Sequence, residues 1–236
     1  MTSPRTAGQG SMAQVKDLCI DACDAERVGR FWADLLGLEA RAHDRRKVVG
    51  LWRGDRPVIW VNQVDEAKQL KNRVHLDLVA PSLDPIAELG ASVVADHVEW
   101  KVMADPEGNE MCIFPPSEAH RSDEPPARIL AICVDSPEPE ALAQWWAERT
   151  GAKVGPGSDG APRWLHGASG LDGLTWKFVP VHDERHTENR MHWDVVADVA
   201  PLVVAGATVV RAPDEDIDWT VLHDPEGNVF CAFPPQ

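Results

Sequence analysis

The stretch "NRVHLDL", residues 72–78, returns as "NRMHWDV" at residues 189–195, and this repetition decides the fold. In both copies a histidine and an aspartate stand two positions apart, so on a strand their side chains share one face. The apolar residues that alternate with them point to the opposite face, where a helix can cover them. The same half-buried strand therefore occurs twice.

The segments around this strand are also repeated, in the same order. "CIDACDAERVGRFWADLLG" (19–37) matches "CVDSPEPEALAQWWAERTG" (133–151), and "ADPEGNEMCIFPP" (104–116) matches "HDPEGNVFCAFPP" (223–235). Collinear similarity of this extent indicates a tandem duplication. We expect four segments, namely a disordered tail at 1–12, a first domain at 13–116, an exposed Pro-rich linker at 117–126 and a second domain at 127–236.

Each copy predicts a strand, a helix and further strands, and then the same order again. "VKDLCIDA" alternates as a half-buried strand does, and Asp24 can cap a following helix that ends at Gly37. The residues Pro-Glu-Gly-Asn, at 106–109, have the composition of a tight turn between two late strands. The sequence therefore predicts an α+β fold, and we interpret the turn as structural rather than as an acidic site.

Composition excludes several classes of function. The 38 acidic residues outnumber the 23 basic ones, and a net charge of -15 repels a phosphate backbone, so nucleic acid is not an expected partner. No apolar run approaches the ~18 residues of a membrane span, and the N-terminus lacks the apolar segment of a secretory signal. The five cysteines form no CxxC pair. We expect a cytoplasmic protein with reduced thiols, either a monomer or a homodimer.

The order of "FWADLLGLEA" after the first strand, "NRVHLDL" at mid-domain and "DPEGNEMCIF" at its end resembles the vicinal oxygen chelate superfamily. This superfamily includes glyoxalase I, bleomycin-resistance proteins and extradiol dioxygenases, and the similarity is closest to its glyoxalase-like domains. The resemblance implies two βαβββ modules in each domain, which form a cupped sheet with the helices outside and the site inside. We expect each of the two domains to form its own cup.

The resemblance also implies where a divalent ion would bind. It places Asp17, His75 and Cys112 at ligand positions of the first domain, whereas the fourth position, near Trp60, holds no carboxylate. This mixed oxygen, nitrogen and sulfur set suits Zn better than harder ions. The second domain offers only His192 and Cys231 at matching positions. We expect no cofactor, with Zn or a similar ion in the first domain as the alternative.

The residues of the repeated strand allow two interpretations. His75 can act as a general acid or base near neutral pH, with Asp77 or Asp17 tuning it. Alternatively, His75, Asp77 and Arg73 form a polar network that closes the cup. Cys112 is in the same way either a nucleophile beside His75 or a small core residue of an apolar strand.

Ten tryptophans and no tyrosine give the chain large flat apolar surfaces but no phenol. Trp32 and Trp146 fall on the apolar side of predicted helices and belong to the core. Other tryptophans fall on strands, where they can stack on a planar ligand or fill the core. The side chains that we expect to contact a ligand are Trp60, Asn62, Arg73, Trp100, Trp176 and His192.

These observations favour a cytosolic protein that binds an apolar or aromatic metabolite or natural product in a Trp-lined cup. It would sequester this molecule, as resistance proteins do, or convert it by metal-independent acid/base chemistry through His75. The alternative is a metal-dependent lyase, isomerase or dioxygenase with its site in the first domain. A third hypothesis, an interaction module without a working cup, has no positive support in the sequence.

Overall fold

The computed structural model describes residues 12–43, 47–116, 125–182 and 189–235. Almost all of the expected tail (1–12) and linker (117–126) lies outside the described residues. Within the described ranges the chain forms sixteen strands and four helices. No helix in these ranges is both long and apolar enough to cross a bilayer.

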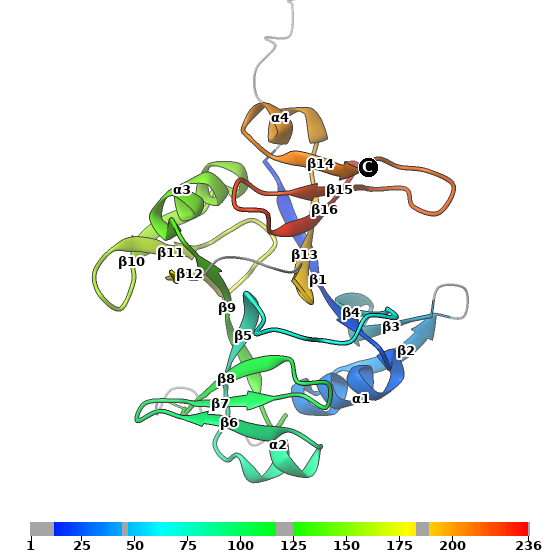
Figure 1. Ribbon diagram of the computed structural model, residues 1–236, viewed down its shortest axis with the longest axis vertical. Coiled ribbons are helices and arrows are strands. Elements are labelled where there is room, and N and C mark those ends of the chain that lie inside the picture. The colour runs from blue at the N-terminus through cyan, green and yellow to red at the C-terminus, as the bar shows by residue number, and fades with distance from the viewer. Residues whose placement is uncertain (1–11, 44–46, 117–124, 183–188, 236) are drawn as a thin grey trace, which may run out of the picture.

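The strands and helices form four βαβββ modules (Figure 1). Module 1 comprises β1 (Gln14–Ala22), α1 (Ala25–Leu36), β2 (Glu39–His43), β3 (Val48–Arg53) and β4 (Arg56–Gln63). Module 2 comprises β5 (Val74–Val79), α2 (Asp84–Glu88), β6 (Ser92–Asp96), β7 (Lys101–Ala104) and β8 (Glu110–Phe114). Module 3 comprises β9 (Arg128–Ser136), α3 (Pro139–Thr150), β10 (Lys153–Pro156), β11 (Pro162–His166) and β12 (Thr175–Pro180). Module 4 comprises β13 (Met191–Val196), α4 (Val199–Val204), β14 (Thr208–Arg211), β15 (Thr220–His223) and β16 (Val229–Phe233). The predicted α+β class, with two modules in each repeat, is confirmed.

The modules pair across the repeats rather than within them. Sheet A has the order β14-β15-β16-β13-β1-β4-β3-β2, and sheet B has the order β10-β11-β12-β9-β5-β8-β7-β6. The central antiparallel pairs are β1 with β13 and β5 with β9, which lie side by side near the middle of Figure 1. Modules 1 and 4 thus share one sheet and modules 2 and 3 share the other. The expectation that each repeat forms its own cup was wrong, because apolar alternation fixes the buried face of a strand but not which of two similar strands it pairs with.

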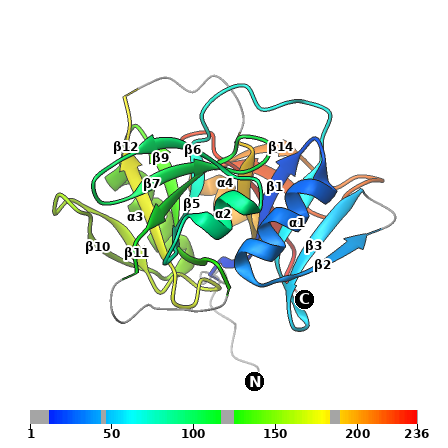
Figure 2. The same cartoon turned by 90° about the horizontal axis from the view of Figure 1, so that it is seen from below.

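The helices begin and end as the sequence predicts. The side chain of Asp24 accepts a hydrogen bond from the backbone N–H of Arg27 at the start of α1, and Gly37 ends that helix in the left-handed conformation, with φ of 62°. Gly151 ends α3 in the same way, with φ of 71°. Figure 2 shows α1 against β3 and α3 against β11, on opposite sides of the molecule.

The repeated Asp-Pro-Glu-Gly-Asn turns lie in the second module of each repeat and hold it by hydrogen bonds to the helix of the first module. Buried Asp105 accepts hydrogen bonds from the backbone of Asn109 and, at 3.1 Å, from Nε1 of Trp32 in α1. Glu107 accepts the backbone N–H of Cys23 (2.8 Å) and of Asp24 (2.6 Å) at the start of that helix. In the second repeat, Trp146 donates to Asp224 in the same way. These acidic residues therefore serve the fold.

One contiguous apolar core includes the helix-covered faces of both sheets. At its centre Trp146 of α3 lies 4.8 Å from Trp176 and 5.3 Å from Trp193, measured between ring centroids. All three rings are fully buried. The faces of the two sheets that carry the repeated His and Asp residues look away from this core, and we call them the open faces.

Candidate functional site

The open face of sheet A collects polar and aromatic side chains from both repeats. Strand register sets Cys19 of β1 between His192 of β13 and Trp60 of β4. Asp17 lies opposite Asp194, which in turn is in register with Cys231 of β16. Because strand side chains alternate, all of these groups point to the same side of the sheet.

All of these side chains except Asp17 border a cavity of about 400 Å³. Trp219 and Phe233 form one wall as a stacked pair, with centroids 5.0 Å apart and planes tilted by 27°. Trp60 and Asn62 of β4 also line the cavity, together with His192. A cavity of this volume with aromatic walls fits a small planar molecule, and its polar lining residues can bind polar groups of that molecule.

A bulge in β1 brings a lysine to the same site. The pairing with β13 shifts register between Val15 and Asp17, so Lys16 is the extra residue of the strand. Its ammonium lies 2.6 Å from Oδ2 of Asp17 and 4.4 Å from the centroid of the Phe233 ring. Trp60 Nε1 donates to the same carboxylate oxygen at 3.0 Å. Asp17 is therefore fixed from two sides.

Asp17 and Asp194 form a close carboxyl pair across β1 and β13. Burial raises the pKa of Asp194 well above its usual value, and the neighbouring Asp17 carboxylate raises it further. The Oδ1 atoms of both residues are buried and accept no hydrogen bond from any described residue. A proton held by Asp194 and directed at Asp17 resolves both observations, since two adjacent carboxylates resist ionising together.

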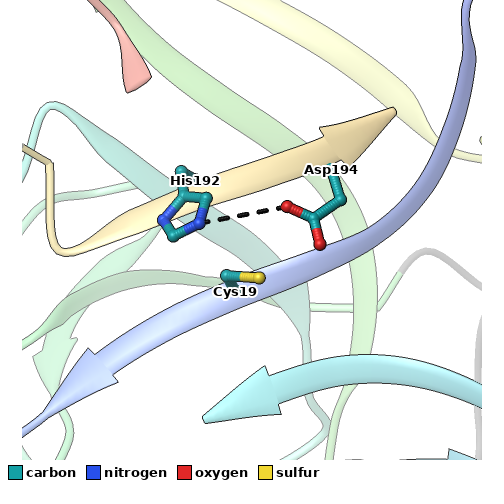
Figure 3. Close-up of side chains that lie close together, drawn as sticks. All are labelled: Cys19, His192 and Asp194. Atoms are coloured by element: carbon teal, nitrogen blue, oxygen red, sulfur yellow. Dashed lines mark ion pairs between the residues drawn. The ribbon is translucent and has the colours of Figure 1, made fainter. Parts of the chain in front are cut away.

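His192 and Cys19 complete this cluster (Figure 3). His192 Nε2 lies 4.0 Å from Oδ1 of Asp194 along β13, and Cys19 faces both from β1. Burial is the largest cause that raises the pKa of Cys19, and it also raises that of Cys231. Both sulfur atoms therefore remain thiols at neutral pH, which makes them poor nucleophiles.

Gly50 of β3 makes room for tryptophan at one side of the cavity. The rings of Trp52 and Trp60 meet edge to face over it, with centroids 6.0 Å apart. A Cβ at position 50 would lie 2.6 Å from Trp52 Nε1 and 2.8 Å from the Trp60 ring. In sheet B the position equivalent to Gly50 is occupied by Trp164, whose ring contacts Lys177.

The open face of sheet B holds a similar cluster with a lysine at its centre. Lys177 Nζ lies 2.8 Å from Oδ2 of Asp77 and 4.7 Å from the Trp164 ring centroid. His75 Nε2 lies 3.6 Å from Oδ1 of Asp77, so these two residues share a face as predicted. Burial lowers the pKa of His75, which favours the neutral imidazole. Lys177 pairs with Cys133 in sheet B, and Trp60 pairs with the equivalent Cys19 in sheet A. The two open faces therefore differ at this position, which is a lysine in one and a tryptophan in the other.

Among the described residues, two groups of three donor side chains lie close enough to share a metal ion, with ligand atoms within 4.8 Å of one another. They are Cys19, His192 and Asp194 in sheet A, and His75, Asp77 and Cys112 in sheet B. The expected set of Asp17, His75 and Cys112 does not form, because Asp17 lies in sheet A. Pairing across the repeats separated these residues.

Neither donor group fits a divalent ion well. In sheet B the ammonium of Lys177 already neutralises Asp77, and a fixed cation at that distance repels a metal ion. Burial raises the pKa of Cys112 to about 12, whereas a metal ligand must be a thiolate. In sheet A the raised pKa values of Cys19 and Asp194 keep these groups protonated and so also oppose metal binding.

The remaining expected ligand residues lie in three different places. Trp176 of β12 points into the core, where its ring packs against Trp146 of α3. Its assignment to a ligand site was therefore wrong. Trp100 stacks on Phe114 at the edge of sheet B, with centroids 5.9 Å apart. Arg73 borders a separate cavity of about 530 Å³ near the start of β5 and β13. Sequence reasoning missed Lys16 and Lys177, because neither falls in the repeated motifs.

The comparison with known families agrees with this arrangement. The model of a glyoxalase-like domain matches residues 17–114 and again 131–233, which together cover most of the chain. The chain belongs to the glyoxalase-like domain family. The two matched segments confirm the vicinal oxygen chelate superfamily and the tandem organisation that the repeated motifs predicted. No curated protein matches the sequence significantly.

Solved structures of similar fold are distant in sequence. Glyoxalase I from Zea mays superposes with a TM-score of 0.59 at 13% identity, covering 93% of this chain and 92% of that one. A putative dioxygenase from Bacillus subtilis gives a TM-score of 0.64 at 13% identity, covering 96% of this chain and 86% of that one. The cppA protein from Streptococcus pneumoniae gives 0.52 at 10% identity, with coverage of 95% and 100%. At these identities the likeness shows the shared fold of this glyoxalase-like protein and nothing about its reaction.

Proposed function

We propose that this glyoxalase-like protein binds a small, planar and largely apolar molecule in the sheet-A cavity. The observation that carries the proposal is the cavity of about 400 Å³ between Trp60 on one side and stacked Trp219 and Phe233 on the other. Aromatic walls favour a flat ligand because each ring contact adds about 0.5–1.5 kcal/mol to the gain from burial. The names of two structural neighbours, a glyoxalase I and a putative dioxygenase, support a small-molecule ligand.

The polar side of the cavity is suited to proton transfer. Asp194 retains its proton to a higher pH than an ordinary aspartate and can donate it to a bound molecule. His192 Nε2, within 4.0 Å of Asp194, can accept a proton in the opposite step. Asp17 stays in place through Lys16 and Trp60 and orients the Asp194 carboxyl. The site can therefore bind a ligand, or isomerise it by moving a proton without a metal.

A panel of planar natural products and metabolites, titrated against intrinsic fluorescence and checked by calorimetry, tests this proposal. Binding should weaken at least about tenfold in Trp60→Leu, since a truncated aromatic wall loses roughly 1–3 kcal/mol of contact. The matched control is Trp164→Leu on the open face of sheet B, which should bind as the wild type does. Equal loss in both variants, or no binding by the wild type across a broad panel, would refute the proposal.

A metal-dependent lyase, isomerase or dioxygenase is the second candidate function. Its support is the proximity of Cys19, His192 and Asp194, whose ligand atoms lie within 4.8 Å of one another. Plasma mass spectrometry of protein purified without chelators or a His-tag column distinguishes the two candidates. We expect less than about a tenth of an ion per chain, because these donors hold their protons. About one ion per chain, lost in His192→Ala and retained in His75→Ala, would favour the second candidate.

A further inference from the structure

A second cavity, of about 420 Å³, lies where the first strands of the two repeats begin. The hairpin between β3 and β4 and the loop between β11 and β12 flank it, together with the first residues of β1 and β9. Its lining has four cationic side chains and two acidic ones. The cations are Lys16, Arg53, Arg56 and Arg128, and the acids are Asp17 and Asp172. An excess of positive charge is unusual in a chain whose net charge is -15.

Arg128, the first residue of β9, has a guanidinium edge that meets no hydrogen-bond acceptor among the described residues. Its Nε and Nη2 atoms are buried and donate no hydrogen bond to any described residue. Leaving charged donors buried and unpaired is costly, so an acceptor bound at this edge would stabilise the site. Nε–H and Nη2–H point in parallel from one edge, which matches two oxygens of a carboxylate or a phosphate.

The acidic residues of the lining do not satisfy this edge. Asp17 is already bound through Oδ2 to Lys16 and Trp60 on the sheet-A side. Asp172 forms no ion pair with Arg128 in the described structure. Arg53 and Arg56 are exposed at the rim, where they add positive potential at the entrance.

Hydrogen bonds between the two sheets hold the cavity wall, one from the backbone and one from a side chain. The N–H of Val15 in β1 donates to the carbonyl of Ser169 at 2.8 Å, and Arg56 Nη2 reaches the carbonyl of Gly170 at 3.5 Å. The approach is so close that a Cβ at Gly170 would lie 1.8 Å from the Val15 oxygen. The loop before β12 is therefore fixed against β1, and the pocket behind it is part of the fold.

We propose that this second cavity binds a small oxyanion, either a carboxylate or a phosphate, two of whose oxygens accept from Nε and Nη2 of Arg128. Arg53 and Arg56 attract the anion and complete the charge balance at the rim. The lining of this cavity shares Lys16 with that of the sheet-A cavity, but the proposal rests on Arg128 and does not depend on the function proposed for the sheet-A cavity.

Heteronuclear NMR of the arginine Nε–H groups tests the proposal on the full chain. Inorganic phosphate and acetate are titrated separately, with chloride at matched ionic strength as the reference. We expect phosphate or acetate, but not chloride, to shift the Arg128 resonance and to raise the thermal midpoint. The tighter of the two anions identifies the source, a phosphorylated molecule or a carboxylic acid.

Three variants complete the test. Arg128→Gln should abolish the anion-dependent rise of the thermal midpoint, and the Arg53→Gln and Arg56→Gln double variant should weaken binding at least about tenfold. Arg30→Gln, on the exposed side of α1 with its side chain 71% exposed, is the matched control and should leave affinity unchanged. Absence of any Arg128 shift in the wild type would overturn the proposal. Wild-type affinity in the double variant would also overturn it, even if Arg128→Gln fails to fold.

Discussion

Replacing Asp194 with Asn tests whether the carboxyl pair of sheet A holds a proton. The amide has the shape of the protonated acid, and its NH₂ group can donate to Asp17 as that acid does. Burial and Asp17 raise the pKa of Asp194 in the folded state above its value in the unfolded chain. The wild type therefore has this contribution to stability in full below about pH 4, and loses it progressively as the pH rises toward the raised pKa.

The magnitude follows from proton linkage. Over the window in which Asp194 is protonated when folded but ionised when unfolded, each pH unit costs the wild type about 1.4 kcal/mol. The Asn variant has no such cost at this position. Its free energy of unfolding, relative to the wild type, should rise by up to about 1.4 kcal/mol per pH unit from about pH 4 upward. Urea unfolding followed by tryptophan fluorescence between about pH 4 and pH 8 measures this difference.

Asp77→Asn in sheet B is the matched control, because Asp77 occupies the equivalent position but faces Lys177 at 2.8 Å. Removing that carboxylate leaves a buried ammonium unpaired, and the variant should lose about 3–5 kcal/mol at neutral pH. Opposite effects of one substitution at two repeat-related positions would be hard to obtain by other routes. If Asp194→Asn follows the wild-type pH dependence or destabilises as Asp77→Asn does, then Asp194 is ionised in the fold and the proposed proton donor does not exist.

Two further predictions concern the contacts that hold the modules together. Trp32→Phe removes the donor to buried Asp105 and should lower the free energy of unfolding by roughly 1–3 kcal/mol, as urea denaturation would show; an unchanged midpoint would contradict the role of this bond. Gly170→Ala should cost about 1–3 kcal/mol more than Gly167→Ala, because both glycines have positive φ but only the first would place a Cβ against Val15. Thermal unfolding of the two variants compares them directly, and equal losses would argue against the clash.

Local sequence predicted the parts of the fold that depend on neighbouring residues. The cap at Asp24, the stop at Gly37 and the shared face of His75 and Asp77 all follow from spacing along the chain, and the structure has each of them. Strand partners were a different matter, since β1 can pair with either of two similar strands. That choice depends on contacts between modules that are far apart in sequence.

Our prediction of the face to which a strand side chain points was wrong where the register of the strand departed from simple alternation. We expected Trp60 and Trp176 both to contact a ligand, but strand pairing makes Lys177, not Trp176, the counterpart of Trp60. A shift of one residue moves a strand side chain to the other face, so Trp176 entered the core instead of the cavity. The bulge at Lys16 has the same effect, because it turns a residue toward Asp17 that plain alternation would point away.

The most direct test of the central proposal is the indole Nε1–H NMR spectrum during titration with a planar ligand that binds. Each of the ten tryptophans gives one such signal, so the spectrum reports where the ligand lies. The sheet-A cavity predicts shifts at Trp60 and Trp219, with Trp100 and Trp164 of sheet B unchanged. Shifts confined to Trp100 and Trp164 would place the working site on the other sheet and contradict the account given for this one.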